Sequence, residues 1–97
     1  MKIIQPMALE KFAKQHANAR KSLATWKKAV EEATWKKNKD VLKDFPNAKM
    51  LANKRARFEI LHNNYRLIAE LDYEDSILDI RFIGTHSEYD KINAATI

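Results

Sequence analysis

Three consecutive segments in the C-terminal half of the chain alternate apolar and polar residues with a period of two. The first contains Ala56, Phe58 and Ile60, and the alternation continues over residues 65–71 and 77–83. This period is typical of β-strands that bury one face in a core. The segments therefore predict three antiparallel strands with one apolar face that must be covered.

The turns between these segments set the predicted strand register. Asn63-Asn64 tolerates positive φ, so we expect a two-residue hairpin turn there. The next turn falls within residues 73–76, and a two- or four-residue loop gives the same pairing. The predicted partners are Ile60 with Leu67, Phe58 with Ala69, Arg57 with Glu70, Arg55 with Asp72, Leu71 with Leu78, Ala69 with Ile80 and Leu67 with Phe82.

The opposite face of the predicted sheet is too polar to be a second core. Arginines and carboxylates alternate on it, so it is either a solvated face with cross-strand ion pairs or a surface that holds an RNA backbone. Glu70 falls beside Asp79, and we expect Arg57 and Arg81 to offset that repulsion. The face carries Arg57, Glu59, Arg66, Ile68, Glu70, Asp79, Arg81 and Ile83.

The N-terminal half has the helical period and supplies the cover. Residues 1–4 predict a short strand, and Gln5-Pro6 opens an amphipathic helix. Asn18 is the predicted N-cap of a second helix. We expect an α+β fold in a single domain spanning residues 1–97. In it, two N-terminal helices pack on one face of a small antiparallel sheet, and a short helix follows near the C-terminus.

A third helical stretch, residues 38–45, is predicted with Val41, Leu42 and Phe45 facing inward. Pro46 ends it, because the residue before proline disfavours the α region. Trp35 lies in the preceding connection, next to two lysines. It could stack on a nucleobase, but a tryptophan near a helix end more often covers the core, and we favour that interpretation.

Composition narrows the possible functions. The chain has no cysteine, one glycine and two prolines, which argues against a disulfide framework, a thiolate metal site and a Gly-rich phosphate loop. No apolar run reaches the roughly 20 residues that span a bilayer, so we expect a cytoplasmic protein without a membrane partner. The formal net charge of +5 suits a polyanionic partner and equally an ordinary soluble surface.

The predicted strand at residues 77–83 runs directly into a short helix. We expect Gly84 to let the chain turn between the two. Thr85 and Glu88 have the spacing of a capping box, in which each side chain accepts a hydrogen bond from a free backbone N–H of the new helix. His86 therefore lies where the strand ends and the helix begins.

The strand pairing brings residues that are distant in sequence to one end of the sheet. We expect His62, Arg66, His86 and Tyr89 to gather there, around the Asn63-Asn64 turn. An imidazole titrates near neutral pH, and an arginine is a fixed cation. Together they supply the base, the charge stabilisation at phosphorus and the acid that RNA cleavage by its own 2′-hydroxyl requires.

The same residues also have structural interpretations. His86 can bond the backbone at a helix start, Tyr89 can pack its ring on the sheet, and His16 is most simply a histidine on a helix face. The three histidines do not have the spacing of metal ligands. Neither a metal site nor another cofactor is predicted.

Two segments and their context resemble a known family. Asn64–Ile68 (N-Y-R-L-I) and Arg81–Lys91 (R-F-I-G-T-H-S-E-Y-D-K), preceded by two helices and the Phe45-Pro46 break, resemble the HigB-type toxins of bacterial toxin–antitoxin systems. The more specific part is T-H-x-E-Y-D-K after an apolar strand. The chain departs from the family at residues 61–64, where a glycine-containing turn is usual, so His62 is not carried over from it.

The resemblance implies a RelE-like, metal-independent endoribonuclease that cleaves mRNA, commonly at the ribosome. It implies as partner a HigA-type antitoxin with a helix-turn-helix DNA-binding region. On matching positions it favours His86 as acid or base, Arg66 and Arg81 on the phosphate, and Tyr89 positioning or stacking a base. Together with the basic charge, these considerations predict RNA binding by Lys49, Lys54, Arg55, Arg57, His62 and Lys91.

Two other classes of function stay open. A non-catalytic RNA- or ribosome-binding module fits the basic charge equally well, but it gives no reason for histidine, arginine and tyrosine to converge at one sheet end. A protein-interaction domain whose polar sheet face docks a helix is the third class. It overlaps with the toxin, because antitoxins often wrap such proteins.

Overall fold

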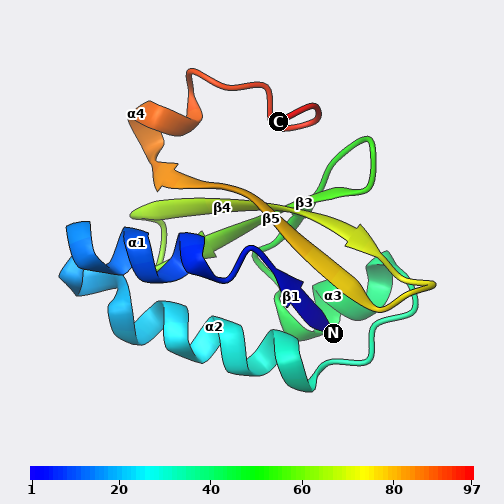
Figure 1. Ribbon diagram of the computed structural model, residues 1–97. Helices are drawn as coiled ribbons and strands as arrows, with labels where there is room; N and C mark the ends of the chain where they lie inside the picture. The colour runs from blue at the N-terminus through cyan, green and yellow to red at the C-terminus, as the bar shows by residue number, and fades with distance from the viewer.

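The computed structural model describes residues 1–97 and contains a five-stranded sheet with the order β1–β5–β4–β3–β2 (Figure 1). Strand β1 runs parallel to β5, and the other neighbouring strands are antiparallel. The strands are β1 (Lys2–Ile4), β2 (Lys49–Met50), β3 (Arg55–Ile60), β4 (Tyr65–Asp72) and β5 (Ile77–Thr85). The helices are α1 (Met7–Gln15), the 3₁₀ turn η1 (Ala17–Ala19), α2 (Arg20–Glu32), α3 (Asn38–Asp44) and α4 (His86–Tyr89).

Helices α1 and α2 lie on one side of the sheet, and the segment that follows β5 lies on the opposite side (Figure 1). We call the sheet face on the side of this C-terminal segment the outer face. The arrangement confirms the predicted α+β architecture, with N-terminal helices on one sheet face and a short C-terminal helix. The strand predicted at residues 1–4 is also present and forms one edge of the sheet beside β5.

Phe58 lies in an aromatic cluster within the core. Its ring centroid is 5.4 Å from that of Trp26, 5.2 Å from that of Phe45 and 6.4 Å from that of Trp35. Trp35 is 2% exposed, and its Nε1 donates a hydrogen bond to Asp44 Oδ2 at 2.8 Å. The core interpretation of Trp35 is therefore confirmed, and its ring is not available to stack on a base.

The hairpin between β3 and β4 has a four-residue loop, residues 61–64, in place of the predicted two-residue turn. Ile60 pairs with Tyr65, so each predicted β3–β4 partner is wrong by two residues. A shift of two keeps every side chain on the same face, and hydrophobic alternation could not distinguish the two registers. Leu61 and His62 adopt positive φ, at 52° and 59°, and the two asparagines do not.

Strand β5 has a bulge at Arg81. Up to Ile80 the β4–β5 pairing is the predicted one, but beyond the bulge Phe82 pairs with Ile68 and not with its predicted neighbour. The extra residue turns Phe82 onto the outer face and Ile83 towards the core, which reverses both predictions. Ile68 lies on the outer face as predicted, yet it is completely buried, so part of this face is covered.

Two helix predictions are also corrected. Ala19 occupies the N-cap position of α2, whereas Asn18 Oδ1 accepts a hydrogen bond from the Tyr65 hydroxyl at 2.8 Å. A buried hydroxyl needs a partner, and this one takes the asparagine that could have capped the helix. In α3 Val41 is buried, but Leu42, predicted to face inward, is 39% exposed.

We expect Phe58→Ala to lower the free energy of unfolding by about 3 to 5 kcal/mol, because it leaves a cavity between the rings that pack on this side chain. Urea denaturation followed by tryptophan fluorescence measures the change. Met7→Ala is a suitable control, since Met7 is 69% exposed and its loss should change stability by less than about 0.5 kcal/mol. Equal effects of the two substitutions would contradict the central position of Phe58.

Candidate active site

Helix α4 begins with the predicted capping box. Thr85 Oγ1 accepts a hydrogen bond from Glu88 N at 3.3 Å, and Thr85 N donates one to Glu88 Oε1 at 2.8 Å. The backbone N–H of Thr85, and after it the Thr85 hydroxyl, lowers the pKa of the Glu88 carboxyl. Both side chains hold the start of the helix, and His86 follows directly.

Gly84 lies inside β5 and not in a turn, which corrects the prediction. It pairs with Arg66 and its φ is not positive, so the chain turns only after Thr85. A Cβ atom at this position would come within 2.7 Å of Phe82 Cζ and 3.0 Å of Glu88 Oε1. Glycine is needed here for space, because the Phe82 ring and α4 pack directly against the strand.

The hairpin loop between β3 and β4 holds His86, the first residue of α4. His86 Nε2 donates a hydrogen bond to the main-chain oxygen of Asn63 and lies 3.2 Å from Asn63 Oδ1. A carbonyl oxygen can only accept, so this contact places a proton on Nε2. In the neutral ring Nδ1 is then the nitrogen that can accept a proton.

Arg66 and Tyr89 form a cation–π pair one helical turn from His86. Arg66 Cζ lies 4.9 Å from the centre of the Tyr89 ring, and the Phe82 ring centroid lies 6.4 Å from that of Tyr89. The aromatic ring supports one face of the guanidinium, whose N–H groups point outward from its edge and can bind an anion. This part of the outer face therefore combines an oriented imidazole with a fixed cation.

The structure thus brings together three of the four predicted catalytic residues, His86, Arg66 and Tyr89. His62, which the predicted register grouped with them, lines a separate cavity of about 230 Å³ that includes Pro46 and Glu59. It still lies at the predicted end of the sheet, because it belongs to the same hairpin loop as Asn63, which contacts His86.

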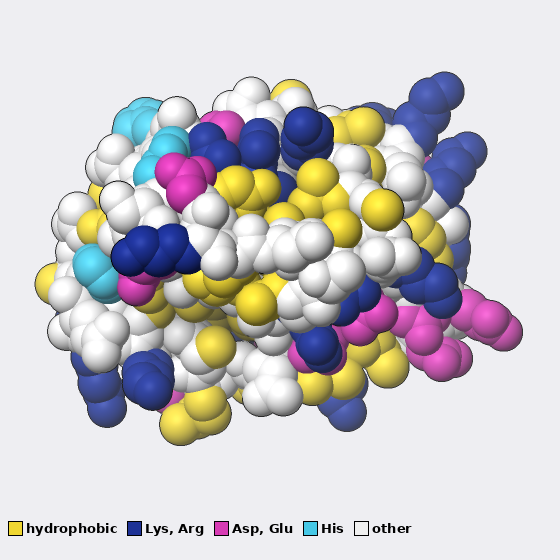
Figure 2. Space-filling model, turned by 90° about the horizontal axis from the view of Figure 1, so that it is seen from above, with side chains coloured by type: hydrophobic (Ala, Val, Ile, Leu, Met, Phe, Trp, Pro, Cys, Tyr) yellow, Lys and Arg dark blue, Asp and Glu magenta, His cyan; other side chains and the backbone are white.

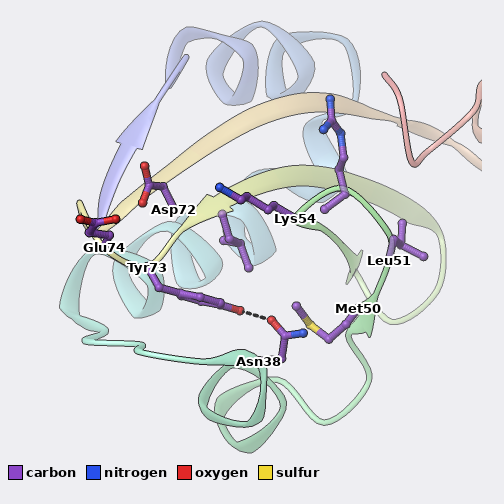
Figure 3. Close-up of a pocket in the computed structure, with 9 residues that line it drawn as sticks. Asn38, Met50, Leu51, Lys54, Asp72, Tyr73 and Glu74 are labelled. Carbon is purple, nitrogen blue, oxygen red and sulfur yellow. Dashed lines mark hydrogen bonds between the residues drawn. The ribbon is translucent and has the colours of Figure 1, made fainter.

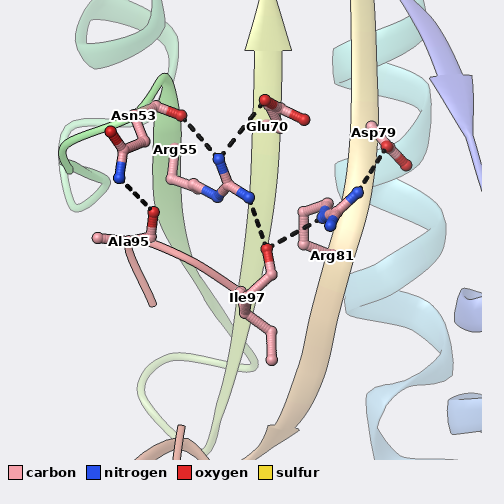
Figure 4. Close-up of polar contacts among 7 residues, drawn as sticks. All are labelled: Asn53, Arg55, Glu70, Asp79, Arg81, Ala95 and Ile97. Atoms are coloured by element: carbon pink, nitrogen blue, oxygen red, sulfur yellow. Dashed lines mark hydrogen bonds and ion pairs between the residues drawn. The ribbon is translucent and has the colours of Figure 1, made fainter. Parts of the chain in front are cut away.

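The fourth predicted catalytic residue, Arg81, belongs to another set of polar contacts on the outer face (Figure 4). Arg81 Nη1 lies 3.3 Å from Asp79 Oδ2, and its Nε donates to the main-chain oxygen of Ile97 at 3.1 Å. Arg55 Nη2 donates to the same oxygen at 2.7 Å, and its Nη1 lies 3.5 Å from Glu70 Oε2. We call Arg55 and Arg81 the arginine pair.

The strand register explains the charges around the arginine pair. Glu70 lies directly opposite Asp79, as predicted. The two cations that offset this repulsion are Arg55 and Arg81, whereas the predicted Arg57 faces Ile68 and not Glu70. Because β3 is shifted by two residues, Arg55 lies opposite Glu70 at the position predicted for Arg57.

Several arginine N–H groups on the outer face are buried without a partner. The Nε atoms of Arg55, Arg57 and Arg66 make no hydrogen bond within the protein. Leaving a buried donor unpaired is costly, and an anionic acceptor removes that cost. We call these three residues and Arg81 the arginine strip, which extends along the outer face towards the Tyr89 pair.

The other basic residues predicted to bind RNA lie at separate places around the strip. Lys49 is in the edge strand β2 opposite Arg57, Lys54 precedes β3, and Lys91 follows α4 near Glu88. Viewed from the side of the C-terminal segment, lysine and arginine side chains appear around the face and the histidines lie towards one end (Figure 2). The spread of basic residues over the face suits an extended polyanion, which the net charge alone could not indicate.

The largest cleft, of about 380 Å³, lies at the end of the sheet away from His86 (Figure 3). Tyr73 donates a hydrogen bond to Asn38 Oδ1 at 2.6 Å across its wall. Burial, and after it the nearby Asp40 carboxylate, raises the pKa of the Tyr73 hydroxyl. Arg55 also lines this cleft, so the cleft adjoins the arginine strip but contains no histidine.

Two further features bear on the class of protein. No group of three or more His, Cys, Asp or Glu side chains is arranged to hold a metal ion. None of the helices has the length and apolar character that a membrane span requires. The chemically active groups of the outer face are imidazole, guanidinium and phenol side chains.

Sequence reasoning missed four residues of these clusters. Asn63 was taken as a turn residue, and nothing in the sequence showed that its oxygen would accept from His86. Phe82 was assigned to the core, since the bulge could not be read from the pattern R-F-I. The contacts of Asn53 and Ile97 join segments far apart in the chain, and no local motif indicates them.

Comparison with known families gives one match. Residues 19–92, about three quarters of the chain, match the model of the HigB toxin family, described as a RelE-like toxic component of a toxin–antitoxin system. The match includes β3, β4, β5 and α4, which carry the arginine strip and His86. A search of curated proteins gives no match.

We expect Gly84→Ala to disturb α4, because the new methyl group must displace the Phe82 ring or the Glu88 side chain. If the capping box is lost, the backbone amide of Glu88 should exchange faster with solvent in the variant than in the native chain, which NMR can measure. Ala69→Gly is a control of the same size in the neighbouring strand, since it removes a methyl group without crowding α4. Unchanged exchange at Glu88 in Gly84→Ala would show that the contacts above Gly84 are not tight.

Proposed function

This chain belongs to the HigB family of RelE-like toxic components of toxin–antitoxin systems, and on that premise we propose that it is a metal-independent endoribonuclease that cleaves mRNA. The observation that carries the proposal is the contact between His86 Nε2 and the Asn63 main-chain oxygen. It leaves His86 Nδ1 as a proton acceptor, and Tyr89, whose ring contacts Arg66, lies one helical turn further along α4.

The proposed reaction is an attack of the RNA on itself. His86 Nδ1 takes the proton of a 2′-hydroxyl, and the resulting oxygen forms a bond to the adjacent phosphorus. The bond from phosphorus to the 5′-oxygen breaks, and that oxygen leaves as a hydroxyl after taking a proton from Tyr89 or from water. The products are a 2′,3′-cyclic phosphate and a 5′-hydroxyl.

In the proposed reaction, arginine side chains stabilise the negative charge that develops on the phosphate oxygens. Arg66 is held by the Tyr89 ring at 4.9 Å and has a buried Nε without a partner, so it is preorganised for an oxyanion. Arg81 lies further along the strip, and we assign it to the phosphate backbone next to the cleaved bond. We assign Lys49, Lys54, Arg57 and Lys91 to contacts with flanking phosphates.

The partners follow from the same proposal. A toxic component of this kind is paired with an antitoxin, and we propose a HigA-type protein with a helix-turn-helix region. We also propose that cleavage takes place on the ribosome, where mRNA is presented as a single strand that the outer face can bind. A non-catalytic RNA-binding module is the second candidate, supported by the unpartnered Nε atoms of the arginine strip.

We expect His86→Ala to slow cleavage about 10²- to 10⁴-fold, the range lost with a general base. Arg66→Ala and Arg81→Ala should slow it as well, with Arg66→Lys less damaging because it keeps the charge. Induction of each variant in cells, followed by mapping of new mRNA 5′ ends, measures the effect. Lys11→Ala removes one positive charge from exposed α1 and is the matched control, with cleavage unchanged.

Two outcomes would contradict the catalytic proposal. One is growth arrest by the native chain without new mRNA ends, which would favour the binding module. The other is cleavage by His86→Ala at the rate of the native chain, with thermal unfolding showing both proteins folded.

A further inference from the structure

The oxygen bound by the arginine pair belongs to the chain itself. The guanidinium groups of Arg55 on β3 and Arg81 on β5 reach across β4 and converge on the main-chain oxygen of Ile97, at 2.7 and 3.1 Å (Figure 4). Two guanidinium groups converging on one oxygen form an arrangement that suits an anionic oxygen such as that of a phosphate. An oxygen of the chain's own last segment occupies a position that also suits a phosphate oxygen.

Burial and charge support this interpretation. The Arg55 side chain is 11% exposed, and its Nε is buried without a partner although its other nitrogens are bonded. The carboxylates of Glu70 and Asp79 flank the arginine pair, but their side chains are 38% and 24% exposed and each makes one ion pair. An anion that replaced the Ile97 oxygen would therefore find Arg55 Nη2 and Arg81 Nε as donors.

The segment that supplies the Ile97 oxygen is held by few contacts. Asn53 Nδ2 donates to the Ala95 oxygen at 2.8 Å, and the arginine pair binds Ile97. Within the segment the Asn93 oxygen accepts from Ile97 N at 2.9 Å, and Asn93 Oδ1 accepts from Ala95 N at 3.0 Å. We call residues 93–97 the strap. A short segment with so few contacts opens more readily than the strands beneath it.

We propose that the arginine pair is a phosphodiester subsite and that the strap occupies it until RNA displaces the Ile97 oxygen. The inference rests on the proposed function and adds an intramolecular competitor to the same site. The strap lies outside the residues that match the family, which end at residue 92. We choose a nucleic acid over an acidic peptide because the unpartnered Nε atoms of Arg57 and Arg66 continue the subsite as a strip.

Two variants release the strap and keep the contacts of the arginine pair, because Arg55 Nη1 binds the main-chain oxygen of Asn53, which a substitution retains. Asn53→Gly removes the amide that binds Ala95, and glycine keeps the positive φ of 60° found at this position. Asn93→Ala removes the oxygen that folds the strap from within. The probe is a short fluorescein-labelled 2′-O-methyl RNA, which has no free 2′-hydroxyl and reports binding without cleavage.

We expect each release variant to bind this probe about threefold more tightly or better than the native chain, because the competent fraction of the site increases. Arg55→Ala should weaken binding and lower the slope of log affinity against log salt by about 0.7, the effect of one lost phosphate contact on a single strand. In the Asn53→Gly/Arg55→Ala double variant the gain from release should disappear. Arg81→Ala provides the same comparison should Arg55→Ala not fold.

Three outcomes would overturn the proposal. The first is unchanged probe affinity in both release variants. The second is a full gain from Asn53→Gly in the Arg55→Ala background. The third is release that improves binding of a poly-glutamate peptide but not of the RNA. Failure of the proposed function would give a different result. If the variants show these binding changes but the native chain does not cut unmodified RNA, only the catalytic proposal is contradicted.

Discussion

The position of β4 between β3 and β5 is the constraint on which the candidate site depends. Both neighbours pair with β4, so their registers decide which side chains share the outer face. The bulge at Arg81 then moves Phe82 outward, where its ring packs near Tyr89. It also places Gly84 opposite Arg66 and leaves room for α4. A strand without this extra residue would send Phe82 into the core and remove the support beneath Tyr89.

The fold was largely predictable because its signals are local or periodic. Alternation gave the three long strands, and the helical period gave α1 and α2. The Thr85–Glu88 spacing gave the capping box. The prediction of the β3–β4 register failed. A shift of two residues changes every strand partner but leaves every side chain on the same face, so the alternation could not reveal it. The bulge failed for a different reason, because Phe82 and Ile83 are both apolar and either could face the core.

The candidate site was partly predictable for the same reasons. His86, Arg66 and Tyr89 belong to the ends of elements whose order was clear, so an error of two residues still left them near one another. His62 lies in the same hairpin loop as Asn63, but its side chain lines a cavity with Pro46, a contact that the pattern did not indicate. The contacts of Asn53 and Arg55 with the strap were beyond reach, because residues 93–97 have no periodic or capping signal that relates them to the sheet.

The outer face divides the proposed work between its two ends. Near α4 an imidazole is oriented by Asn63 and a guanidinium by Tyr89, which suits chemistry at one phosphate. Towards the strap the arginine pair suits binding of another phosphate along the same strand. The proposed reaction requires cations that are fixed in advance, and the strands hold the arginines of the strip with their Nε atoms buried.

The most direct test of this mechanism is the chemistry of the cut ends. The purified chain, alone and with translating ribosomes, is given an mRNA and a matched copy in which the 2′-hydroxyl at the cleavage position is replaced by hydrogen. We expect a 2′,3′-cyclic phosphate and a 5′-hydroxyl from the first and no cut at that position in the second. Products with a 3′-hydroxyl and a 5′-phosphate, or undiminished cleavage of the substituted copy, would contradict attack by the 2′-hydroxyl.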